Sequence, residues 1–182
     1  DATAKNKLDL AGTVKAAKAD LTSRDDAITQ SGGTLEVTTG PSNLDADTTI
    51  TLDKANDFVG PVNVLDGTDV TLNDKNDLNL GSVTTSGKLN ATAANKLALS
   101  GIVKPGSMDL TATTGAIEQT GGEVEVRGDT DLTADGDITF DKANNDFQSL
   151  VSASGDNVTL NDTDNLDLGA ATATGTLKAT AA

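Results

Sequence analysis

The 182-residue sequence contains no histidine, cysteine, tryptophan or tyrosine, and its only aromatic residues are three phenylalanines. Without histidine and cysteine the chain has no imidazole base, no thiolate nucleophile, no Cys/His zinc site and no disulfide. Three phenylalanines do not make the aromatic platforms on which proteins stack bases or sugars. We therefore expect a fold held by packing and hydrogen bonds alone, and most catalytic classes are disfavoured.

Positive charge is also scarce, since 13 Lys and Arg stand against 28 Asp and Glu, for a net charge of −15. This acidity argues against nucleic acid and anionic membrane surfaces as partners. No apolar run approaches the roughly 20 residues of a membrane helix, so no membrane insertion is expected. The N-terminus shows no signal-peptide pattern, and because it begins with Asp1 rather than Met we expect a processed product or a piece of a longer chain.

The sequence does contain a clear internal repeat. Matching blocks return 88 or 89 residues later, the second with one extra Asn: Ala27–Gly33 as Ala116–Gly122, Ile50–Phe58 as Ile138–Phe147, and Val70–Asp74 as Val158–Asp162. Ala-Thr-Ala begins at residues 2, 91 and 179. These matches predict two tandem repeats, 2–90 and 91–178, with the start of a third at 179–182.

Each repeat is built from shorter units in which an apolar residue alternates with a polar one, as in Leu35-Glu36-Val37. Period two between clusters of turn-forming residues is typical of strands with one buried face. We also interpret Val14–Leu21 and its counterpart Val103–Leu110 as strand and turn, because Pro105-Gly106 disfavours a helix. Apolar positions return about once per coil in three series: Ile50, Val70, Leu89 and Met108; Val62, Leu78 and Leu97; and Ile138, Val158 and Leu177, which repeat the first series.

This spacing predicts an all-β fold, a right-handed parallel β-helix (β-solenoid) with about 16–20 residues per coil and roughly ten coils. At ~4.8 Å per coil the rod would be roughly 48 Å long. Leu, Ile, Val and Ala would fill the interior, whereas Phe58 and Phe147 are expected near a corner or in a small external patch. The alternative is a β-sandwich, or two sandwich domains. Disorder, which the acidity alone would allow, does not account for inward-facing periodicity.

Several blocks resemble the repeat region of large filamentous-haemagglutinin-like bacterial exoproteins: Asn161–Gly169, Ala116–Gly122 and Gly175–Ala181. The resemblance covers essentially the whole chain. It implies a right-handed parallel β-helix that is exported across the outer membrane, often by a two-partner system, and serves adhesion. No functional residue is carried over from that family, because such repeats are mainly shaft.

Clusters of Asp and Asn are the first candidates for chemistry, since their oxygens suit Ca²⁺. They fall in two groups: Asp156, Asn157, Asn161, Asp162, Asp164 and Asp167, and Asn73, Asp74, Asn76 and Asp77. Calcium-binding β-rolls use Gly-Gly-x-Gly-x-Asp runs, and no such run is present. Asn and Asp also occur at turns, where their side chains bond the local backbone. We favour that reading and predict no metal site.

Paired carboxylates are the second candidates, because polysaccharide hydrolases use them. The possible pairs are Asp53 with Asp57 and Asp141 with Asp146. A block that occurs twice unchanged indicates a structural corner rather than a catalytic site. Lys54 and Lys142, beside Asp53 and Asp141, are expected to form weak exposed ion pairs. We predict no catalytic residue, no cofactor and no enzymatic activity.

Two further readings concern the surface. Thr-x-Thr spacing, as in Thr172–Thr176, suggests an ice-binding face, but the motif does not recur at the coil period. A specific glycan- or protein-binding module would need an unrepeated loop, and the copies diverge most between Thr38–Asn43 and Arg127–Asp131. Neither segment carries a recognition signature.

The leading hypothesis is a structural shaft segment of a secreted or surface-exposed bacterial filamentous adhesin. Its localisation would be extracellular or on the bacterial cell surface. The expected partners are other copies or adjoining repeats stacked end to end, because Ala179-Thr180-Ala181 lies in phase with Ala2-Thr3-Ala4.

Overall fold

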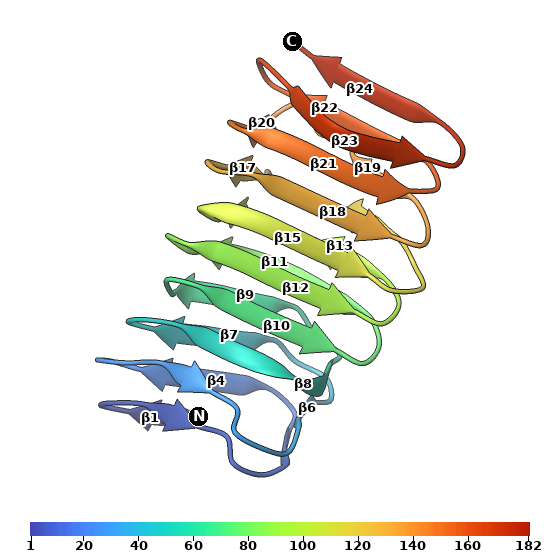
Figure 1. The fold of residues 1–182 in the computed structure, drawn as a ribbon. Coiled ribbons are helices and arrows are strands. Elements are labelled where there is room, and N and C mark those ends of the chain that lie inside the picture. Colours follow the sequence, from blue (N-terminus) through green and yellow to red (C-terminus); the bar gives the residue numbers. More distant parts are fainter.

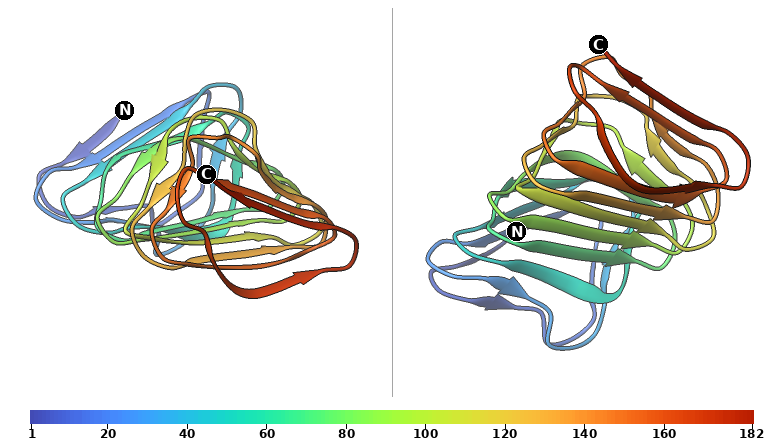
Figure 2. Two further views of the ribbon diagram at one scale, coloured as in Figure 1. Left: turned by 90° about the horizontal axis from the view of Figure 1, so that it is seen from above. Right: turned by 45° about the horizontal axis from the view of Figure 1, so that its top comes forward.

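The computed structural model describes residues 1–182 and shows a parallel β-solenoid of about nine turns, without helices (Figure 1). Every strand pairing is parallel, so the sandwich alternative is wrong. The winding is right-handed, as predicted: seen from the C-terminal end, the chain runs counter-clockwise towards the viewer (Figure 2, left). The two termini lie at opposite ends of the rod.

Two long sheets form the broad faces of the rod. Sheet A runs in the order β1 (Ala2–Ala4), β4 (Ala19–Ser23), β7 (Ser42–Ala46), β9 (Val62–Asp66), β11 (Leu78–Thr84), β13 (Leu97–Leu99), β16 (Ile117–Gln119), β19 (Ile138–Phe140), β22 (Val158–Asp162) and β24 (Leu177–Ala181). Sheet B runs in the order β2 (Leu8–Asp9), β5 (Ile28–Thr29), β8 (Ile50–Phe58), β10 (Val70–Asp74), β12 (Lys88–Ala93), β15 (Ser107–Ala112), β18 (Thr130–Ala134), β21 (Leu150–Gly155) and β23 (Asp167–Ala173).

A short third side joins the two sheets in some turns. In the N-terminal half it consists of β3 (Val14–Ala16), β6 (Leu35–Val37) and the end of β8, on the path from sheet B to sheet A. In the C-terminal half it consists of β14 (Val103–Lys104), β17 (Glu125–Val126) and β20 (Asp146–Phe147), on the path from sheet A to sheet B. The third side therefore changes edges halfway along the rod.

This change of edge arises from the length of the repeat. A turn takes about 20 residues, so 88–89 residues occupy about four and a half turns. Equivalent strands of the two copies thus lie on opposite sheets: β10 is in sheet B, whereas its counterpart β22 is in sheet A. The third Ala-Thr-Ala, in β24, is back in sheet A with β1. One repeat is related to the next by half a turn about the rod axis.

The register confirms part of the predicted coil spacing and corrects the rest. Ile50, Val70, Leu89 and Met108 are paired in succession, as are Ile138, Val158 and Leu177, but the second series lies on sheet A rather than on sheet B with the first. Leu78 pairs with Leu97, but Val62 pairs with Leu80 instead of Leu78. Turns that include the third side reach 23 residues, from Leu21 to Leu44. The chain consequently makes about nine turns rather than ten.

A continuous core of 39 buried residues fills the rod, chiefly Leu, Ile, Val and Ala as predicted. Phe58 and Phe147 lie on the third side, near a corner as predicted, but the alternative of an external patch is wrong, because they are 2% and 1% exposed. The third side explains the difference, because it widens the interior enough to hold a ring. Phe147 packs edge-to-face on Phe140, with ring centroids 5.9 Å apart.

Candidate functional site

The repeated sequence blocks come together at the third side, where they bury polar side chains. In the first copy these are Gln30, Asn56 and Asp74, and in the second copy Gln119, Asn145 and Asp162. Each set comes from three successive turns. These six polar side chains can be buried because each has hydrogen-bond partners inside the rod.

A reciprocal amide pair forms the centre of each set. Gln30 Nε2 donates to Asn56 Oδ1 at 2.8 Å, and Asn56 Nδ2 donates to Gln30 Oε1 at 3.1 Å. Asn56 also accepts from Leu35 N–H and donates to the Leu52 carbonyl. In the second copy Gln119 and Asn145 make the same two bonds, both at 2.7 Å. Each pair closes the corner where the chain leaves a long sheet for the third side.

The glycine pairs that follow these glutamines form the turn at the same corner. Gln30 Nε2 lies 3.3 Å from the carbonyl oxygen of Gly33, which has φ +61°. Gly122 has the same φ. A Cβ at Gly33 would overlap the backbone of Gly12 in the turn below. The blocks AITQSGG and AIEQTGG thus encode a left-handed turn tied to a buried amide.

The buried aspartates end the third side. Asp74 Oδ2 accepts from Phe58 N–H at 2.6 Å, and Asp162 Oδ2 accepts from Phe147 N–H at 2.8 Å. A carboxylate thus takes the place of the next strand at an open sheet edge. Burial raises the pKa of the Asp74 carboxyl to about 6, and the Asp57 and Asp77 carboxylates act in the same direction. Burial also raises the pKa of Asp162.

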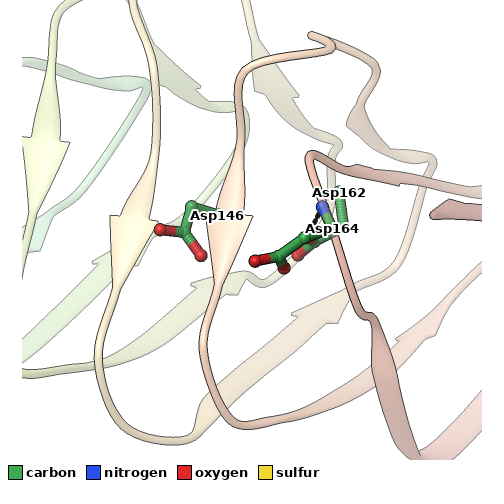
Figure 3. A group of neighbouring side chains, drawn as sticks. All are labelled: Asp146, Asp162 and Asp164. Carbon is green, nitrogen blue, oxygen red and sulfur yellow. Dashed lines mark hydrogen bonds between the residues drawn. The ribbon is translucent and has the colours of Figure 1, made fainter. Parts of the chain in front are cut away.

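The residues that could hold a cation lie at the second of these edges. Oxygens of Asp146, Asp162 and Asp164 lie within 4.8 Å of one another (Figure 3). Both Asp162 oxygens already accept backbone N–H groups, one from Phe147 and one from Asp164. Of the Ca²⁺ ligands considered from the sequence, the structure brings only Asp162 and Asp164 into this cluster. The third member, Asp146, was considered only as a carboxylate partner of Asp141.

The first copy has a different charge pattern at the equivalent edge. There Asp57 forms an ion pair with Lys75 at 3.1 Å and accepts a hydrogen bond from Asn76 Nδ2 at 3.3 Å. Thr163 and Asp164 replace Lys75 and Asn76 in the second copy. The acidic cluster is therefore a local substitution on a structural edge that both copies share.

Lysines pair with three of the four carboxylates of the proposed pairs, and the fourth, Asp146, accepts a hydrogen bond from Gln148. Lys54 Nζ lies 3.0 Å from Asp53, and Lys142 Nζ lies 2.8 Å from Asp141, which confirms the predicted exposed ion pairs. The hydrogen bond from Lys142 lowers the pKa of Asp141. Asp57 is paired with Lys75, as described above. These ion pairs link neighbouring residues at the corners of the rod.

Outward hydroxyls form a column over the C-terminal part of sheet B, in the register Thr92, Thr111, Thr133, Ser154 and Thr172. The neighbouring column begins with Thr29, Thr51 and Thr71 but continues with Asn90, Asp109, Asp131 and Ser152, so the threonines of the two columns do not lie side by side. Periodicity in the sequence did not reveal the hydroxyl column, because coil lengths vary from turn to turn. Paired Thr-x-Thr columns, which the ice-binding reading requires, do not form here.

The comparisons with known proteins concern the repeat itself. The sequence model of a family described as "Repeats of unknown function (DUF5649)" matches residues 1–65, 67–106, 92–154 and 155–182. No curated protein and no solved structure matches the chain. The structure contains no helix long and apolar enough to cross a membrane.

Proposed function

The chain belongs to this family of repeats of unknown function (DUF5649), and we propose that it is a shaft segment of a bacterial filamentous adhesin, secreted or exposed on the cell surface. The observation that carries the proposal is the unbroken stacking of both long sheets from one end of the rod to the other. The resemblance of the repeat blocks to filamentous-haemagglutinin-like exoproteins supplies the adhesive context.

The proposed mechanism is mechanical. The structure has 112 backbone hydrogen bonds, and those between turns run along the rod axis, where they resist extension. The aliphatic core couples each turn to its neighbours, as in other solenoids. A net charge of −15 keeps neighbouring rods soluble and apart.

The length of two repeats matches a whole number of turns, which allows the rod to be extended by further repeats. Two repeats complete a whole number of turns, so β24 reaches the sheet on which β1 began. A third repeat in the same chain would therefore present its strands on the same faces as the first repeat. Adjoining repeats, or other copies stacked end to end, are the partners that this arrangement favours.

Antibodies against the 182-residue chain provide the test. On bacteria that make the protein, immunogold labels should follow surface fibres along their length, and a strain lacking the gene should lose the label. Labels confined to the cytoplasm, or gathered only at fibre tips, would refute the shaft proposal. Electron microscopy of the purified chain should show rods of about 43 Å, from nine turns at ~4.8 Å.

A further inference from the structure

A hollow of about 230 Å³ lies on the outer face of sheet B near the C-terminal end. Outward side chains of β18, β21 and β23 line it: Asp131, Thr133, Ser152, Ser154, Ala170 and Thr172. Pockets for drug-sized ligands are typically ~300–1,000 Å³. The hollow therefore suits one small polar unit.

At the equivalent place in the first copy, on the outer face of sheet A, an asparagine side chain occupies the space. Asn63 lies beside Asn43 on sheet A, and its Nδ2 donates to Asn43 Oδ1 at 2.8 Å. Asn63 Oδ1 accepts from Ser82 N–H at 3.0 Å. The amide thus bridges an acceptor on one strand and a backbone donor on another.

In the second copy smaller side chains replace those that occupy this space in the first copy. Asp131, Ser152 and Ala170 stand at the positions of Asn43, Asn63 and Ser82. Asp131 and Ser152 are paired in register, as Asn43 and Asn63 are. Asp131 makes no side-chain hydrogen bond or ion pair, and no side chain accepts from Ala170 N–H.

We propose that this hollow binds a single saccharide unit. The absent amide defines what a ligand must offer: a donor towards the Asp131 carboxylate and an acceptor towards Ala170 N–H. Vicinal hydroxyls or an acetamido group on a sugar provide both, and the hydroxyls of Ser152, Ser154 and Thr172 add further partners. An ammonium group would satisfy only Asp131.

The expected affinity is weak, because no aromatic ring lines the hollow. Weak sites become effective through multiplicity, and a fibre of many repeats would provide it. Of the two repeats, only the second has this hollow open, so a fibre built of such pairs would carry one site per pair of repeats. The site extends the shaft role and does not depend on it.

The test is a titration followed by amide NMR shifts, with N-acetylglucosamine, glucose and acetamide as probes. We expect saturable shifts around residues 131–133, 152–154 and 170–172. Shifts with N-acetylglucosamine and acetamide but not glucose would assign the acetamido group, and shifts with both sugars but not acetamide would assign the hydroxyl pair. No saturable shift with either sugar would overturn the proposal, including the case in which acetamide alone binds.

Two exchanges between the copies serve as matched variants. Ser152→Asn restores the amide, so it should weaken sugar binding about tenfold or more while the rod stays folded. Asn63→Ser opens the matching space on sheet A, so it should add shifts around residues 43–45 and 63–65. Unchanged sugar binding in Ser152→Asn would refute the site even if Asn63→Ser fails to fold.

Discussion

Replacing Asn56 by alanine tests the buried corner most directly. In the folded rod, Asn56 Oδ1 accepts from Leu35 N–H at 2.8 Å and Asn56 Nδ2 donates to the Leu52 carbonyl at 3.0 Å. Both partners are buried, and the alanine side chain replaces neither bond. Gln30 keeps two weaker contacts, to the Gly33 carbonyl and from Lys54 N–H, each at 3.3 Å.

The magnitude follows from the two groups that lose their partner. A buried polar group without a hydrogen bond costs about 1–3 kcal/mol. Asn56→Ala should therefore lower the free energy of unfolding by about 2–5 kcal/mol. Because Gln30 and Asn56 act as a pair, Gln30→Ala in the Asn56→Ala background should cost less than Gln30→Ala alone.

Urea denaturation followed by circular dichroism measures this loss, and hydrogen exchange at β6 locates it. The control is Asn144→Ala, since Asn144 is the extra residue of the second copy and lies exposed at the equivalent corner of that copy. That variant should stay within about 0.5 kcal/mol of the parent. If Asn56→Ala matched Asn144→Ala, or if the Gln30 and Asn56 effects were simply additive, the buried pair would not hold the corner.

Three further predictions concern other parts of the same edges. Because the pKa of Asp74 is raised to about 6, above its unfolded value near 3.9, the folded chain takes up a proton first as the pH falls. The free energy of unfolding should therefore rise as the pH is lowered from 7.5 to 5. Over the same range the urea midpoint of Asp74→Asn should rise less than that of the parent chain, and an equal rise in both would contradict the assignment. Gly33→Ala should cost at least about 1–3 kcal/mol, because its positive φ strains an alanine and its Cβ would also overlap the backbone of Gly12. Gly12→Ala, where a Cβ meets nothing within 4 Å, should be nearly neutral in thermal melts. Calcium or EDTA should leave the melting temperature unchanged, because Asp162 is already engaged by two backbone N–H groups; a rise with calcium that Asp164→Asn removes would show a metal site.

Much of the fold was predictable because strand period and turn chemistry are local properties. Triplets such as Leu35-Glu36-Val37 mark strands whatever lies above or below them, and the Val14 to Leu21 segment forms β3 and β4 as predicted. The buried amides were not predictable in this way. Gln30 and Asn56 are 26 residues apart, and only stacking of the turns brings them within hydrogen-bond distance.

The sequence by itself determined the fold class, since alternating apolar residues, turn formers and a repeated block specify a stacked β-rod. Only the tertiary structure decided which face each copy presents. Whether 88–89 residues close a whole number of turns depends on the length of every loop, and the third side adds residues to some turns and not to others. The absence of histidine, cysteine, tryptophan and tyrosine limits the side-chain chemistry of the rod wherever the residues lie. The half-turn between copies, and the hollow where Asn63 has become Ser152, emerged only once the turns were stacked in register.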